Sequence, residues 1–116
     1  MFTRLELKTM FSSDLDLRTW RPEDPQCFSF WLQLDIGQEG GPGADIFQAV
    51  VVTPEALKRD ESIGPARHRV PIVLVSYDYD HLKDAVESTI ATCNRLTWDE
   101  SVDALRERFM WEYERT

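Results

Sequence analysis

The sequence predicts an α+β domain, in which C-terminal helices pack on one face of a mainly antiparallel sheet of about four strands. Three observations support this fold class. Residues 28–36 alternate strictly, which is the period of a strand with one buried face. A glycine-rich turn, Gly37–Gly43, joins them to a second apolar run, as in an antiparallel hairpin. Helical spacing of apolar residues is concentrated after residue 78. The length of 116 residues fits a single domain over residues 1–116.

The first strand is expected over residues 2–11. Leu5 and Leu7 share one parity of this segment with Thr3 and Thr9, so all four are predicted to point toward the core. Charged residues occupy the intervening positions, which is the pattern of a strand with one solvated face.

A long connection, residues 12–26, precedes the central hairpin. It is rich in turn formers and acids, and its two prolines argue against a long helix. We expect Leu15, Leu17 and Trp20 to hold this connection against the edge of the core. Long connections are more often functional than short ones.

The central hairpin organises the sheet. Its first strand directs five apolar side chains inward: Phe28, Phe30, Leu32, Leu34 and Ile36. Trp31 and Asp35 have the opposite parity. If a helix covers that face, Trp31 belongs to the core; if the face is open, a tryptophan ringed by polar groups is a typical interface anchor. After the second strand, Ile46–Val52, Thr53 and Pro54 predict a helix to residue 60, with threonine as N-cap and proline at the first helical position.

The second half of the chain begins with a polar loop over residues 61–70, which contains the basic cluster Arg67-His68-Arg69. The apolar run Pro71–Tyr77 predicts a strand that is covered on both faces or buried in the middle of the sheet. A helix is expected over residues 81–95, capped by Asp78 or Asp80.

A final helix is expected over residues 98–114, because Thr97 and Glu100 have the spacing of a capping box. Its predicted core face consists of Trp98, Val102, Leu105, Phe109 and Tyr113.

Composition excludes several classes of function. The net charge of −8 argues against nucleic acid as a direct ligand, since phosphates would be repelled. It favours a basic protein partner, or simply solubility. No apolar run approaches the roughly 20 residues that cross a bilayer, and the N-terminus is unlike a signal peptide. We therefore expect no membrane association and a cytoplasmic location. Cys27 and Cys93 are interpreted as buried, reduced thiols.

No residues predict catalysis, a cofactor or a metal site. The histidines, His68 and His81, lack ligands at metal-binding spacing. A carboxylate–metal hydrolase that uses Asp35, Asp78 and Asp80 is the alternative from a different class, although the pair Asp78 and Asp80 is better explained by helix capping.

Two surfaces are candidates for binding a partner protein. The first contains Trp31 and Asp35. The second is an acidic face of the last helix that presents Asp99, Asp103 and Glu107 at i, i+4 and i+8. Like charges at this spacing destabilise a helix by roughly 0.2–0.5 kcal/mol per pair, although Arg106 partly neutralises Asp103. A solvated helix face is the simpler explanation, and an acidic stripe facing a basic partner is the functional one. The acidic loop of residues 14–24 would support either surface.

Several segments resemble the immunity protein 8 family in order and spacing. They are Arg21-Pro-Glu-Asp-Pro25, Phe28-Ser-Phe-Trp-Leu-Gln-Leu34, Val51-Val-Thr-Pro-Glu-Ala-Leu57 and the ending Phe109-x-Trp-Glu-Tyr-Glu114. One departure is that Ala56-Leu57 stands where typical members have tryptophan after the Thr-Pro.

The resemblance implies a bacterial antidote of a polymorphic toxin system, which binds a cognate toxin in the cytoplasm without catalysis or a cofactor. Many such toxins are nucleases, which suggests that an acidic inhibitor occupies the groove for nucleic acid. A small adaptor or regulatory domain that binds another protein is the remaining alternative. Neither the toxin's identity nor the oligomeric state follows from the sequence.

Overall fold

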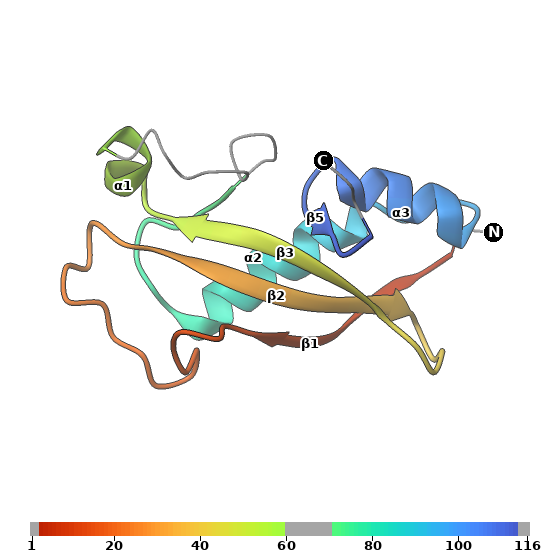
Figure 1. The fold of residues 1–116 in the computed structure, drawn as a ribbon, viewed down its shortest axis with the longest axis horizontal. Coiled ribbons are helices and arrows are strands. Elements are labelled where there is room, and N and C mark those ends of the chain that lie inside the picture. The colour runs from red at the N-terminus through yellow and green to blue at the C-terminus, as the bar shows by residue number, and fades with distance from the viewer. Residues whose placement is uncertain (1–2, 60–70, 114–116) are drawn as a thin grey trace.

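Five strands form one mixed sheet in the computed structural model, which describes residues 3–59 and 71–113 (Figure 1). In chain order the elements are β1 (Leu5–Phe11), β2 (Ser29–Gln38), β3 (Asp45–Val52), α1 (Pro54–Arg59), β4 (Ile72–Val73), α2 (Tyr79–Ala91), α3 (Trp98–Arg106) and β5 (Met110–Trp111). The predicted polar loop with its basic cluster, Arg67-His68-Arg69, lies outside the described residues.

The sheet is built around the hairpin of β2 and β3. β1 and β3 flank β2, and both pair with it antiparallel. The other edge of β3 pairs with β5 antiparallel and with β4 parallel. The predicted α+β class is confirmed, and the sheet is mixed because β4 returns to the edge of β3 in the same direction as β3.

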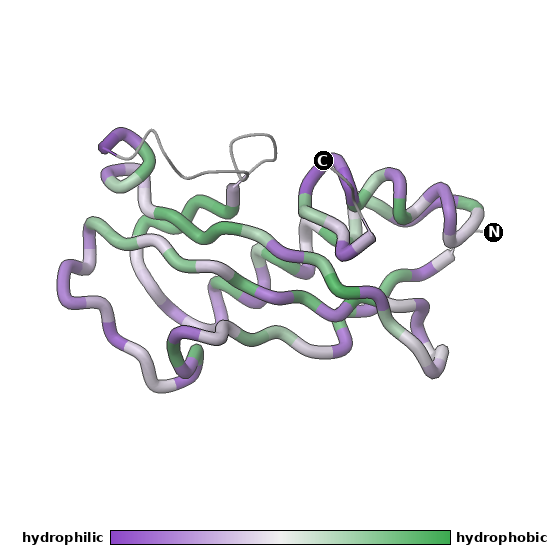
Figure 2. Tube along the Cα trace, viewed as in Figure 1, coloured by the Kyte–Doolittle hydropathy of each residue, from purple (hydrophilic) through white to green (hydrophobic). Residues whose placement is uncertain are grey.

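The core lies between one face of this sheet and the helices α2 and α3. The inward side chains of β2 and β3 share a cluster with Leu82, Val86 and Ile90 of α2 and with Val102 and Leu105 of α3. Figure 1 shows α2 behind the strands, and Figure 2 shows apolar residues concentrated in the strands and on the helices, with the connection from β1 to β2 mostly polar. Burial of these apolar faces is the main source of stability.

The predicted helix caps are confirmed, although α2 begins at Tyr79 and ends at Ala91, both earlier than the predicted 81–95. Thr53 Oγ1 accepts the backbone N–H of Ala56 at the start of α1 (3.2 Å). Asp78, one of the two expected caps, accepts the N–H of His81 (3.0 Å), and Thr97 accepts the N–H of Glu100 (3.1 Å). Each bond satisfies one of the N–H groups that lack a partner within the helix.

The predicted orientation of β1 is correct for Leu5 and Leu7 and wrong for Thr9. The register shifts between Leu7 and Thr9, which is the geometry of a β-bulge. Because a bulge adds one residue, it reverses the alternation beyond it. Met10 therefore packs against the core, and Thr9 points to the opposite face.

The strand predicted over residues 71–77 is much shorter, because the chain leaves the sheet after Val73. Leu74 still donates its N–H to Val52 O (3.0 Å), but Val75 is 80% exposed. Tyr77 turns back to the core, where its hydroxyl donates to the carbonyl of Leu17.

The connection of residues 12–26 is held against the core as predicted. Leu17 is buried, and Leu15 and Trp20 pack against the core cluster. Trp20 makes edge-to-face contacts with Phe28 (5.4 Å between ring centroids) and Tyr77 (4.9 Å), an arrangement that aromatic quadrupoles favour.

The final helix ends at Arg106, earlier than predicted. Phe109 is buried as expected, but the chain then turns back to form β5 against Phe47 and Gln48 of β3. Tyr113 is 63% exposed, so its predicted place on the core face is wrong. Helical spacing alone cannot reveal that the open edge of β3 offers the chain a second set of hydrogen-bond partners.

Candidate functional site

The candidate site is the sheet face opposite α2 and α3, which we call the open face. Cross-strand pairing places its side chains in two rows, Thr9–Asp35–Ile46 and Phe11–Gln33–Gln48. Paired residues of neighbouring strands point to the same face, so the register alone assigns these six side chains to one surface. Trp31, which pairs with Val50, completes the open face.

The open face mixes apolar and polar groups. Phe11 is 45% exposed and Ile46 is 36% exposed, while the amides of Gln33 and Gln48 lie opposite each other in the register. Exposed apolar side chains grouped with neutral polar ones, rather than with many charges, are typical of the centre of a protein–protein interface.

Trp31 lies at the border between a covered and an uncovered part of this face. It packs against a small second cluster of Val50, Val52 and Ala56, to which α1 contributes Ala56. Trp31 nevertheless stays only partly buried. The helix α1 therefore covers the Val50–Val52 end of this face, and the face is open toward Asp35; a role of Trp31 in an interface stays a prediction.

Asp35 is held in one orientation by neutral donors. Thr9 Oγ1 donates to its Oδ2 (2.5 Å) and Gln33 Nε2 donates to its Oδ1 (3.2 Å). Within residues 3–59 and 71–113 it has no cationic partner. A partly exposed carboxylate that is oriented without being neutralised can accept hydrogen bonds from a basic partner group.

The acidic face of α3 is a separate surface, which we call the acidic stripe: Asp99, Asp103 and Glu107. All three are exposed. Arg106 lies 3.9 Å from Asp103, as predicted, and the Asp103 side chain is 76% exposed. Such a pair contributes little to stability. Because α3 packs on the core side of the sheet, the structure does not bring the acidic stripe together with Trp31 and Asp35.

The alternative hydrolase site is not assembled. Asp35 lies on the open face, whereas Asp78 caps α2 on the other side of the sheet. Among the described residues, no three His, Cys, Asp or Glu side chains are grouped so as to hold a metal ion. Cys27 is a partly buried free thiol and Cys93 a buried one. No described helix is long and apolar enough to cross a membrane.

Sequence reasoning missed Thr9, Phe11, Ile46 and Gln48 as members of this face. Thr9 and Phe11 were missed because the bulge in β1 reverses the alternation from which their orientation was predicted. Alternation at Ile46 and Gln48 would have indicated those two residues, but the apolar run that follows, Ala49–Val52, makes the pattern unrecognisable.

The fold is a single α+β domain, and the open face is its candidate contact surface. The family model described as immunity protein 8 matches residues 5–115. Since this match covers nearly the whole chain, the protein belongs to the immunity protein 8 family, and its general role is immunity against a toxin. No curated protein and no solved structure matches the chain.

Proposed function

We propose that this protein is a non-enzymatic immunity protein of a bacterial polymorphic toxin system, which binds and neutralises one cognate toxin domain in the cytoplasm. Membership of the immunity protein 8 family gives the general role. The observation that supports binding as the mechanism is the open face, with Phe11 and Ile46 exposed beside the oriented carboxylate of Asp35.

The open face is the proposed primary contact. Trp31 and Asp35 lie on it, and Trp31 is held by the cluster beneath α1. An aromatic side chain that is already packed on one side loses little conformational entropy on binding, which is a property of interface hot spots.

Charge is the proposed source of rapid and selective encounter. The chain has a net charge of −8, and the exposed acidic stripe of Asp99, Asp103 and Glu107 adds local negative potential. Complementary charge accelerates association and discriminates against wrong partners. A basic toxin, such as a nuclease that binds phosphates, is therefore the proposed partner class.

Co-expression tests the proposal. The protein is produced together with the toxin domain encoded immediately upstream, and growth and co-purification are measured. We expect growth to be restored and a stable complex to be recovered. The triple reversal D99K/D103K/E107K then reports the contribution of the acidic stripe. If the toxin remains toxic and forms no complex although the immunity protein is well folded and soluble, this toxin is not its partner.

A further inference from the structure

The outer edge of β1 is an unpaired strand edge. Within the described chain, β1 pairs with β2 alone. Leu5 shows which groups point outward, because its N–H donates away from β2 to Asn94 Oδ1 beyond the end of α2 (3.0 Å). Backbone groups alternate between the two edges of an antiparallel strand. The N–H and C=O of Leu7 therefore point to the same outer edge, and no side chain among the described residues caps the Leu7 N–H as Asn94 caps that of Leu5.

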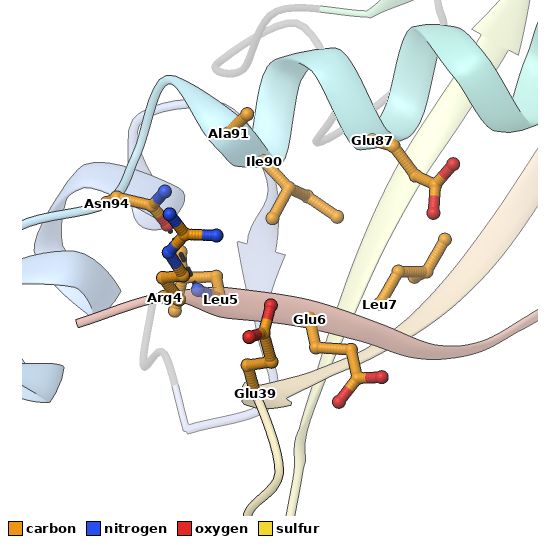
Figure 3. A pocket seen from close by; sticks show the side chains of 9 residues that line it. All are labelled: Arg4, Leu5, Glu6, Leu7, Glu39, Glu87, Ile90, Ala91 and Asn94. Carbon is orange, nitrogen blue, oxygen red and sulfur yellow. Dashed lines mark hydrogen bonds between the residues drawn. The ribbon is translucent and has the colours of Figure 1, made fainter. Parts of the chain in front are cut away.

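A groove of about 500 Å³ runs between this edge and α2 (Figure 3). We call it the β1–α2 groove. Its apolar floor consists of Leu5, Leu7, Ile90 and Ala91. A groove between an edge strand and a helix is the geometry in which an extended segment adds to a sheet, with its backbone bonded to the edge and alternate side chains on the floor.

Two carboxylates border the groove without partners. Glu39 approaches from the strand side and Glu87 from the helix, and neither side chain has a hydrogen bond or ion pair within the described residues. Glu6 differs, since Lys8 Nζ lies 2.8 Å from it, and this hydrogen bond holds the pKa of Glu6 below its usual value. The free charges at the groove are therefore mainly negative, with Arg4 as the exposed cation.

We propose that the β1–α2 groove binds an extended segment of the toxin that carries lysine or arginine. The segment adds to β1 as a further strand. Its backbone bonds to the N–H and C=O of Leu7, and its basic side chain meets Glu39 and Glu87. This inference rests on the proposed function, and it adds to the open face a second contact with the same partner.

A second copy of this chain is a poorer occupant. It would bring another Glu39 and Glu87 toward the same groove, and like charges at close range are unfavourable. The bulge at Lys8 also breaks the regular edge that two copies of β1 would need for continuous pairing, whereas the proposed toxin segment bonds to Leu7, which precedes the bulge.

Backbone hydrogen exchange tests the proposal directly. The amide exchange of Leu7 is measured in the free protein and in its complex with the toxin domain encoded upstream. Because an added strand would accept the Leu7 N–H, we expect exchange at Leu7 to slow by about a hundredfold in the complex. Protection of Leu7 in the free protein, together with a dimeric mass, would instead identify a second copy as the occupant and overturn the proposal.

A charge-reversal pair supplies the matched test. E39K/E87K is expected to weaken binding by about tenfold. D80K/D84K changes the net charge by the same amount at exposed positions outside the groove and should leave binding within about twofold. If the complex forms but the amide exchange of Leu7 does not change, and E39K/E87K binds the toxin with full affinity, the groove is not a contact site. The proposed function would then still stand. The absence of any complex overturns both.

Discussion

Among the described glycines, Gly37 is the one where an added Cβ would meet the closest contact. It lies in β2 beside the turn that leads to β3, and a Cβ built on it would lie 2.1 Å from the carbonyl oxygen of Gly43. Carbon and oxygen atoms that are not bonded do not approach below about 3 Å, so one strand end must move by about 1 Å. The obstacle is backbone and not a flexible side chain, and the distortion would spread into the β2–β3 ladder.

We expect Gly37→Ala to lower the free energy of unfolding by about 3 kcal/mol, at the upper end of the range for overpacking. For a chain of this size, such a loss lowers the melting temperature by roughly 12 °C. Urea denaturation followed by circular dichroism measures the change, and a constant m-value would show that stability rather than the unfolded state has changed.

Gly43→Ala is the matched control, because a Cβ at Gly43 has no atom within 4 Å and its backbone does not have a positive φ. We expect that variant to be unchanged or more stable by about 0.5 kcal/mol, because alanine restricts the unfolded chain. Equal stability of Gly37→Ala and Gly43→Ala would refute the close approach of the two strand ends.

Three further predictions concern the core and the association rate. Thr53→Val should lower the free energy of unfolding, measured by urea denaturation, by about 2 kcal/mol. The reason is that Thr53 Oγ1 accepts the N–H groups of both Phe28 and Ala56 in a buried position. A decrease below about 0.5 kcal/mol would contradict this. Tyr77→Phe should lower the free energy of unfolding by about 1 kcal/mol, because it removes the hydrogen bond from the Tyr77 hydroxyl to the Leu17 carbonyl. Burial raises the pKa of Tyr77 from its usual 10 to about 12, so its contribution to stability is full below pH 10 and is lost as the pH rises through 12. The free energy of unfolding of the wild type should fall over that pH range, and that of Tyr77→Phe should fall less. Parallel plots of unfolding free energy against pH for the two proteins would contradict this. Stopped-flow association with the toxin domain should slow by about tenfold between low and high salt, and a salt-independent rate would contradict charge steering.

Much of the fold follows from the sequence, because local and tertiary preferences agree in those segments. The alternation of β2 and the caps at Thr53, Asp78 and Thr97 each identify their element without reference to the rest of the chain. The inward row from Phe28 to Ile36 is buried as the period of two requires.

The departures arise where one segment depends on another. The bulge near Lys8 reverses the orientation of Thr9, and no feature of residues 5–11 alone reveals it. β5 exists because the edge of β3 accepts it, which ends the helical spacing that otherwise continues to Tyr113. The candidate site has the same origin: Trp31 and Asp35 could be named from parity, whereas Phe11, Ile46 and Gln48 join them only through strand register.

The most direct test of the central claim is the affinity of the open face for its toxin. Gln48→Arg places a long cation on that face, at the β3 end of its second row. Ser88→Arg makes the same change in charge at an exposed position on α2, on the other side of the sheet. Isothermal titration of the toxin domain encoded upstream should show Gln48→Arg binding at least about tenfold more weakly than the wild type, with Ser88→Arg within about twofold. Equal affinities for the two variants would contradict the open face as the surface that binds and neutralises the toxin.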